Sequence, residues 1–331
     1  MTIQPPSSRP REISVTEAIE PAYERVKQML FQPFDLTKWI IIGFCAWLAG
    51  LGESGGGGGG LNGFNGGNHD FNGGNAGEQL RQFYHQASDY VQANFYWIVP
   101  VAVFVMLILL ALWLLVLWLS SCGKFMFLHC VALDTAEVEL PWRKFSGVAN
   151  SLFRFRMVVG LAGLVVMLPL LGFIIAAILR MVLQGGPDVA GVVSVLGLGL
   201  MFLLLALAFA LLHKFMVDFV VPIMFLRGGS CLAAWREFCG LLAANPGSFA
   251  LYVLFQMVLG MAIGALVFVV VLMTCCIAGC LLLLPFVGTV LLLPVLIFKR
   301  AYPLYYLAQF GPQYNVFPVP PALPVQPAAA G

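Results

Sequence analysis

Charged residues are scarce in this sequence. Only 10% of its 331 residues are Asp, Glu, Lys or Arg, whereas 61% are hydrophobic. Soluble domains carry about 25% charged residues, so the composition excludes an ordinary water-soluble domain and indicates a protein solvated by a lipid bilayer. The formal charge of +2 gives no reason to expect a nucleic-acid partner, because the positions of Lys and Arg matter more than their sum in a membrane protein.

Signals for secretion and disulfide bonding are missing as well. Residues 1–38 carry ten charged side chains and no apolar run, so we expect no cleavable signal peptide and assign membrane targeting to the first span. Five of the eight cysteines lie in or near apolar segments or on the predicted cytosolic side, which argues against a disulfide framework. The other three, Cys275, Cys276 and Cys280, lack a usual zinc spacing and a nearby His or carboxylate, and a tight hairpin of small residues explains them as well as a metal does.

Catalytic patterns are also lacking. The tetrapeptide GESG at 52–55 resembles the motif of rhomboid-type intramembrane proteases, in which the serine pairs with a histidine on the last span. Here Ser54 is followed by six glycines and no histidine occurs beyond His213, so we interpret the segment as a loop. Neither an HExxH motif nor a pair of carboxylates within an apolar run is present. We therefore expect a protein that is not an enzyme and that has no metal or cofactor site.

Long uncharged runs predict membrane spans. A helix rises about 1.5 Å per residue, so about 20 residues cross a hydrocarbon core of about 30 Å. Uncharged runs of sufficient length cover 90–123, 157–179 and 189–212, and a run of 61 residues, 238–298, is long enough for two spans joined by a turn near 274–280. A shorter apolar segment, 36–52, is the doubtful case.

The distribution of basic residues favours counting that short segment as a span. When 36–52 crosses the membrane, 15 of the 17 Lys and Arg residues lie on one side and only Arg81 and Arg180 on the other. Because Lys and Arg concentrate on the cytoplasmic side, we expect both termini in the cytoplasm. The sequence thus predicts an all-α, polytopic membrane protein with six transmembrane helices, at about 36–52, 95–119, 157–179, 189–212, 249–273 and 281–298.

Internal repetition organises these spans. The tetrapeptide GKFM at 123–126 recurs as HKFM at 213–216, and WRKF at 142–145 recurs as WREF at 235–238. A weaker third copy begins with YERV at 23–26. We interpret the chain as three repeats of an amphipathic helix followed by a membrane hairpin, over 14–123, 124–213 and 214–310. We also expect disordered tails at 1–13 and 311–331, the latter rich in proline, and an external Gly/Asn-rich loop at 53–79.

Each amphipathic helix has two interpretations. Its apolar stripe, such as Trp142, Phe145 and Leu152 in the second repeat, is most simply a buried joint between hairpins. Alternatively, the helices lie flat at the cytoplasmic interface and bind anionic lipid through their basic side chains. The candidate headgroup contacts are Arg143, Lys144, Arg154, Arg156 and Arg236.

Few polar side chains lie beside or within the apolar runs. Asp218 is the acid closest to such a run, and Lys214 lies at the i,i+4 spacing that pairs charges on a helix. Gln256 is the one strongly polar side chain deep in the fifth span. A structural role, through ion pairing and interhelical hydrogen bonds, competes with a role in a transport pathway, because polar groups inside a membrane are costly.

A family resemblance adds a location. The segments LFQPFDLTKWIIIGFCAWLAGLGESGGGG, GKFMFLHCV, PWRKFSGVANSLFRFR and VDFVVPIMFLRG resemble an uncharacterised family of six-span bacterial and archaeal integral membrane proteins. More distantly, the chain looks like the membrane domain fused to some glycerophosphodiester phosphodiesterases, although their catalytic barrel has no counterpart in these 331 residues. The resemblance implies a multi-pass protein of the plasma (inner) membrane and no particular reaction.

Three function classes follow. We favour a non-enzymatic integral membrane protein that organises or assists partner proteins or lipids, because interfacial helices are plentiful and buried polar chemistry is scarce. Its partners would be membrane lipids and a membrane protein. The alternative is a transporter or lipid-handling protein with a polar pathway between repeats, and a membrane hydrolase using Ser54 is the least favoured.

The topology predicts opposite results for two reporter fusions. Alkaline phosphatase fused after Gly60 should be active in a bacterial host because this position is external, and a fusion after Lys144 should be inactive because this position is cytoplasmic. The measurement is phosphatase activity at matched expression. An inactive fusion after Gly60 together with an active one after Lys144 would overturn the topology.

Overall fold

Helices form every regular element in the described part of the chain, as predicted. The computed structural model describes residues 13–51, 90, 93–183, 188–274 and 277–317. In chain order the elements are α1 (Ile19–Phe31), α2 (Leu36–Gly50), α4 (Phe95–Leu133), α5 (Glu139–Leu183), α6 (Val189–Phe215), the π-helical η1 (Met216–Val220), α7 (Val221–Arg227), α8 (Cys231–Ala244), α9 (Pro246–Met273), α10 (Ile277–Leu283), α11 (Pro285–Leu291), α12 (Leu293–Ala308) and the 3-10 helix η2 (Pro312–Tyr314).

Four described helical segments are long and apolar enough to cross a membrane. They are Phe95–Leu133, Glu139–Val182, Val189–Arg227 and Pro246–Met273. At about 1.5 Å per residue, each exceeds the hydrocarbon thickness of about 30 Å. The chain is therefore a membrane protein, and these segments contain the spans predicted at 95–119, 157–179, 189–212 and 249–273. α2 is apolar but has only 15 residues.

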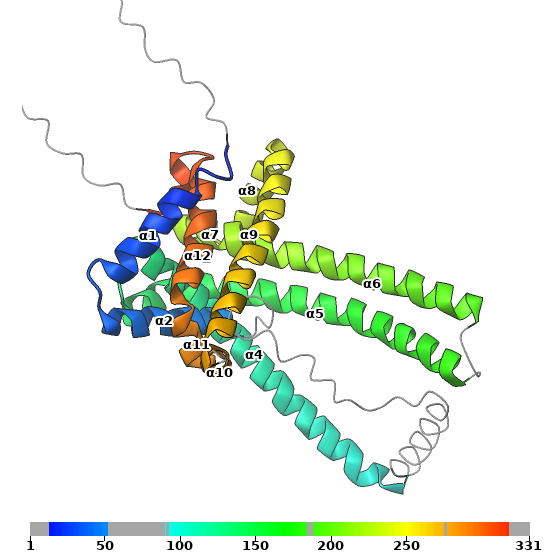
Figure 1. Ribbon diagram of the computed structural model, residues 1–331. Coiled ribbons are helices and arrows are strands. Elements are labelled where there is room, and N and C mark those ends of the chain that lie inside the picture. The colour runs from blue at the N-terminus through cyan, green and yellow to red at the C-terminus, as the bar shows by residue number, and fades with distance from the viewer. Residues whose placement is uncertain (1–12, 52–89, 91–92, 184–187, 275–276, 318–331) are drawn as a thin grey trace, which may run out of the picture.

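The buried core lies at one end of the long helices. In α4 every buried side chain lies from Ser120 onward, α6 has none, and α9 buries only Phe249 and Tyr252. The rest of the core comes from α1, α2, the first part of α5, η1, α7, α8 and α12. Figure 1 shows α4 and the paired α5 and α6 extending away from these elements. We call the packed elements the body, and the apolar parts of α4, α5, α6 and α9 outside it the arms.

The arms expose apolar side chains. Leu109 on α4, Val165 on α5, Leu203 on α6 and Met257 on α9 are each at least 60% exposed. In water such surface costs roughly 25 cal/mol per Å². In a bilayer it costs little, because the hydrocarbon is equally apolar and a helix satisfies its own backbone hydrogen bonds. The arms are therefore the part of the chain that lipid or a partner helix covers.

Helices α2 and α4 cross with their backbones in contact at Gly123. A Cβ atom there would lie 2.5 Å from the backbone nitrogen of Ala49 and 2.6 Å from the carbonyl carbon of Leu48. Small residues allow such close approach of helices in membrane proteins. Ser120, one turn earlier, donates from Oγ to the Ala49 carbonyl at 3.0 Å. The first repeat is thus held together by a glycine contact and a side-chain hydrogen bond.

The beginning of the described chain is fastened to α12. Gln309 donates to the Ser14 carbonyl at 2.9 Å and accepts from the Ser14 N–H at 2.8 Å. Tyr302, which is fully buried, donates from its hydroxyl to the Val15 carbonyl at 2.8 Å. These bonds join segments nearly 300 residues apart in sequence. The N-terminal amphipathic helix is therefore part of the body.

Two cations fasten the N-terminal part of the chain to the end of α4. Arg25 on α1 donates from Nε to the Val131 carbonyl at 3.0 Å and from Nη2 to the Ala132 carbonyl at 2.8 Å. Lys38 on α2 pairs with Asp134, the residue after α4, at 2.9 Å between Nζ and Oδ1. The last carbonyls of a helix have no partner within the helix, and its C-terminal end favours positive charge. The free carbonyls and the preference for positive charge both favour binding of Arg25 and Lys38 at the end of α4.

The other two amphipathic segments also bury their apolar faces against the body. Phe145 and Leu152 are buried in the first part of α5, and Phe238 is buried in α8. Ser230 caps α8 by accepting from the Ala233 N–H at 3.4 Å. These faces contact protein, which favours the interpretation of the segments as joints between hairpins.

Two predicted elements have different boundaries in the structure. α5 runs unbroken over Glu139–Leu183, so the second amphipathic segment and the third span form one helix instead of two, because no Gly or Pro separates them. The sixth span predicted at 281–298 is divided among α10, α11 and α12. Pro285 and Pro294 each begin a new helix, in the first turn where the missing N–H of proline costs nothing.

The start of the predicted C-terminal tail is ordered. Tyr314, in η2, and Val316 are only 7% and 6% exposed. Phe317 stacks on Tyr305 of α12 with ring centroids 4.1 Å apart. The prediction of disorder from residue 311 is therefore wrong for 311–317, because these side chains bury enough apolar surface to order the segment. Residues 1–12 and 318–331 of the two predicted tails, and the loop predicted at 53–79, lie outside the described residues.

The crossing at Gly123 predicts unequal effects of two Gly→Ala substitutions. Gly123→Ala should lower the free energy of unfolding by roughly 1–3 kcal/mol, because the added methyl overpacks against the backbone of α2. Gly147→Ala on α5, where no atom lies within 4 Å, should be neutral or stabilising by about 0.5–1 kcal/mol. Thermal unfolding of the purified protein in detergent measures both. Equal effects of the two substitutions would contradict the close crossing.

Candidate functional site

A π-helical turn interrupts the third long helix. Asp218 lies in this turn, η1, with 9% of its surface exposed. A π turn shifts the hydrogen-bond ladder to i→i+5, and such turns are frequent at functional sites. Arg300 of α12, itself 6% exposed, donates from Nη1 to the Val217 carbonyl in the turn at 2.8 Å. The turn thus brings a buried carboxylate and a buried guanidinium into one region.

Asp218 is the centre of a chain of hydrogen-bonded side chains. Its Oδ2 accepts from Lys214 Nζ at 2.9 Å and from the Tyr252 hydroxyl at 2.9 Å. The Tyr252 oxygen in turn accepts from Gln256 Nε2 at 3.1 Å. We call these four residues the polar network. It joins α6 and η1 to α9, and hydrogen bonds to its ionised members are roughly twice as strong as neutral ones.

Aromatic side chains surround the polar network. The centroid of the Tyr252 ring lies 4.9 Å from that of Phe219, 4.8 Å from that of Tyr306 and 5.9 Å from that of Tyr302. Lys214 Nζ lies 5.7 Å from the centre of the Tyr252 ring, which is within range of a cation–π contact. Tyr252 is fully buried among these rings, so its hydrogen bond to Asp218 lies in a region of low dielectric constant and is strengthened.

A second lysine lies in the field of the polar network. Burial lowers the pKa of Lys299 on α12, the charge of Lys214 lowers it further, and the charge of Asp218 raises it. Asp218 therefore acts on two lysines, of which Lys214 is in direct contact with it. Within the described residues no three His, Cys, Asp or Glu side chains gather as metal ligands. The chemistry that the described groups support is ion pairing and hydrogen bonding between helices.

Three members of the polar network were expected from the sequence. The predicted ion pair of Lys214 and Asp218 is confirmed, although the turn between them is π-helical. Gln256 reaches this pair through Tyr252, a residue that was not expected from the sequence. Tyr252 precedes Gln256 by four residues, so helical spacing placed both on one face, and a buried tyrosine hydroxyl usually has a partner. That spacing was the available signal.

Four of the five candidate headgroup contacts lie on the outside of the body. Arg143, Lys144 and Arg154 are exposed on the first part of α5, and Arg236 is exposed on α8. Arg143 is paired with Glu139 at 3.1 Å, and both side chains are about 80% exposed. Exposed pairs of this kind contribute little to stability, so these side chains remain accessible to a ligand.

Arg156 is placed differently from the prediction. It is 7% exposed, and its Nη1 donates to the hydroxyls of Ser120 and Ser121 on α4 at 3.2 Å each. Successive helical residues are rotated by about 100°, so Arg156 lies about 200° around α5 from the exposed Arg154 and faces the body. The prediction of a headgroup contact is therefore wrong for Arg156, which ties α5 to α4.

Several other candidates carry no site in the described chain. Ser54, Cys275 and Cys276 lie outside the described residues, and Cys280 is an exposed free thiol. Cys45 on α2 and Cys130 on α4 are buried with their sulfur atoms 4.0 Å apart, too far for a disulfide bond.

Fold and sequence together define the class and then the family. The long apolar helices, with a charged network at the end of α6, are those of a helical integral membrane protein. The chain belongs to the family of unknown function DUF7544, which matches residues 13–310. No curated protein and no solved structure matches the chain.

The polar network predicts a specific loss of stability. Tyr252→Phe should lower the free energy of unfolding by about 1–3 kcal/mol, because Asp218 loses a buried donor and Gln256 loses its acceptor. Asp218→Asn should cost at least as much, because Lys214 loses its counter-ion. Thermal unfolding in detergent is the measurement.

The matched control for Tyr252→Phe is Tyr305→Phe. The hydroxyl of Tyr305 forms no hydrogen bond within the described residues, so its removal should change the unfolding midpoint little. Equal midpoints for wild type and Tyr252→Phe would show that the network does not hold α9 to η1.

Proposed function

We propose that this protein is a non-enzymatic integral membrane protein that organises lipids or partner proteins in the plasma membrane. The observation that carries the proposal is the division between body and arms. Polar and charged ties gather in the body, whereas the arms expose apolar side chains such as Leu203 and Met257. The arms are built to contact lipid and membrane helices, and the body is built to hold them at one end.

The proposal includes the six-span, three-repeat topology with both termini in the cytoplasm. In the second repeat, Phe125 of the KFM motif stacks on Phe145 at 6.0 Å. In the third repeat, the equivalent Phe215 contacts the equivalent Phe238 at 5.4 Å. Recurrence of one contact at matching positions supports a common ancestral unit. α2 and the segment α10 to α12, which pack against each other through α11, would supply the remaining two spans. The likeness to the membrane domain of glycerophosphodiester phosphodiesterases stays a prediction.

Exposed basic residues on the body support contact with anionic lipid. Arg154 and Arg236 have no ion-pair partner within the described residues, and both lie on segments assigned to the cytoplasmic side. A basic side chain near an anionic membrane surface contributes about 1 kcal/mol to binding. Two elements, α5 and α8, would therefore bind headgroups at the same membrane face.

A second function, transport of a substrate or lipid, is supported by the polar network alone. Lys214, Asp218, Tyr252 and Gln256 form a continuous polar connection between α6 and α9. In transporters, polar and charged side chains near interrupted helices form the binding sites for substrates and ions. Flux through liposomes that is abolished by Asp218→Asn at normal expression would favour this function over the first.

The proposed function predicts selective loss of anionic lipid on charge neutralisation. Arg154→Gln and Arg236→Gln should each lower retention of anionic phospholipid roughly fivefold after gentle extraction. Mass spectrometry of the purified protein measures lipids and co-purified proteins together. Arg180→Gln, which removes an exposed cation at the opposite end of α5, is the control and should leave retention unchanged.

The same measurement separates the two forms of the proposal. A stoichiometric protein partner would make the chain a subunit or an assembly factor. If lipid retention is unchanged in the variants and no protein partner is found, the amphipathic segments serve only as joints between hairpins. That result would contradict a role in organising lipids or partner proteins.

A further inference from the structure

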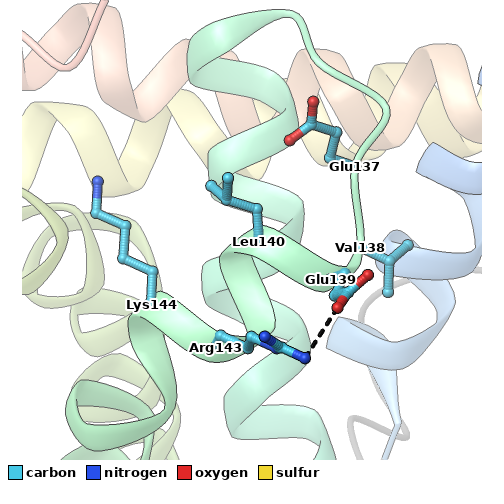
Figure 2. A pocket seen from close by; sticks show the side chains of 6 residues that line it. All are labelled: Glu137, Val138, Glu139, Leu140, Arg143 and Lys144. Carbon is cyan, nitrogen blue, oxygen red and sulfur yellow. Dashed lines mark ion pairs between the residues drawn. The ribbon is translucent and has the colours of Figure 1, made fainter.

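A hollow lies where the chain leaves α4 and begins α5. Its volume is about 720 Å³, within the range of roughly 300–1,000 Å³ that small-molecule sites occupy. Figure 2 shows this hollow from close by. The residues that line it are Glu137, Val138, Glu139, Leu140, Arg143 and Lys144.

Four of the residues that line the hollow are charged, and only two of them form an ion pair with each other. Arg143 and Glu139 neutralise each other at 3.1 Å, as the dashed line in Figure 2 marks. Glu137 and Lys144 form no ion pair within the described part of the chain, and in Figure 2 they stand on either side of Leu140. The hollow therefore offers one carboxylate and one ammonium group, separated by an apolar side chain, with no net charge.

We propose that this hollow binds the headgroup of a zwitterionic phospholipid that carries a primary ammonium group. The lipid phosphate contacts Lys144 and the lipid ammonium contacts Glu137, each through charge-assisted hydrogen bonds. Leu140, which is 54% exposed, contacts the glycerol and the first acyl carbons. The inference rests on the proposed function, because a protein that organises lipid needs a place where one headgroup class is preferred.

The chemistry of the lining selects this headgroup over two others. A purely anionic headgroup would meet the carboxylate of Glu137 as well as the ammonium of Lys144, and the unfavourable contact offsets the favourable one. A quaternary ammonium is typically held by aromatic rings, and none of the six lining residues is aromatic. A primary ammonium has up to three N–H donors, which suit a carboxylate acceptor.

The position of the hollow suits a lipid ligand. It lies between the end of one long apolar helix, α4, and the beginning of the next, α5, on the side assigned to the cytoplasm. The apolar spans predicted at 95–119 in α4 and 157–179 in α5 both have an end on this side, farther along each helix. Under the assigned topology, a headgroup held here lies on the same side of the membrane as the ends of both spans.

A buried histidine adds a polar atom to this region. His129 on α4 is 3% exposed and lies in the electrostatic field of both Glu137 and Lys144. Its ring centroid is 5.9 Å from that of Phe145, the neighbour of Lys144 in sequence. Its Nδ1 has no hydrogen-bond partner within the described residues. Because this atom is buried and His129 is not among the residues that line the hollow, the proposed headgroup contacts rest on Glu137 and Lys144.

Native mass spectrometry of the full-length protein tests the proposal. The protein is released from nanodiscs that contain equal parts of phosphatidylethanolamine, phosphatidylglycerol and phosphatidylcholine. Wild type should retain phosphatidylethanolamine preferentially. Glu137→Gln and Lys144→Gln should each reduce that retention about tenfold, as expected for the loss of one charge-assisted hydrogen bond. Free O-phosphoethanolamine, added in a separate arm, should compete with the lipid.

Glu24→Gln and Lys27→Gln are the matched controls. These residues form an exposed pair on α1, away from the hollow in sequence, and their neutralisation should change retention less than about twofold. Wild-type retention of phosphatidylethanolamine by both hollow variants would overturn the proposal. So would a preference for phosphatidylglycerol that Lys144→Gln abolishes and Glu137→Gln leaves intact, although that result would keep the proposed function. Binding of free O-phosphoethanolamine without any lipid preference would assign the hollow to a soluble ligand and would also overturn the proposal.

Discussion

The rest of the body depends on the close crossing of α2 and α4. Because Gly123 has no side chain, the backbone of α4 lies against Ala49, and Ser120 can donate to the Ala49 carbonyl. The Ser120 hydroxyl then accepts from Arg156, so the position of α5 depends on the same crossing. One close approach of two backbones thereby orients three helices, each of which extends into an arm. A larger residue at this point would separate all three.

Buried polar groups are concentrated where the helices meet, which matches the demands of a bilayer. Groups such as Arg156, Asp218 and Arg300 each have acceptors or donors within the body, because an unpaired polar group in an apolar environment is costly. The arms carry almost none, and their side chains are solvated by lipid. A protein divided in this way keeps its charged groups in the body and its apolar surface on the arms. This division is the observation on which we base the proposed role in organising lipids or membrane partners.

Prediction from sequence succeeded where one local property decides the outcome and failed where neighbours decide it. The apolar runs at 157–179 and 189–212 predicted long helices correctly, because run length alone exceeds the bilayer thickness. The ion pair of Lys214 and Asp218 was predictable because its partners lie one helical turn apart. The burial of Arg156 was not, because it depends on which face of α5 meets α4. The ordering of 311–317 was missed for a similar reason, since proline content suggested disorder while Tyr305 of α12 provided a surface for Phe317.

The sequence by itself determined that this chain is a helical membrane protein, where its long apolar runs lie, and which few polar residues lie beside or within them. Hydropathy and helical spacing are properties of residues close together in the sequence, so they can be read without knowledge of the fold. Only the tertiary structure decided that Tyr252 links Gln256 to Asp218, that Arg156 faces inward, and that Glu137 and Lys144 border one hollow. These facts depend on how far each helix is rotated and where it crosses the next. Such angles are determined by packing between segments distant in sequence, which no local pattern contains.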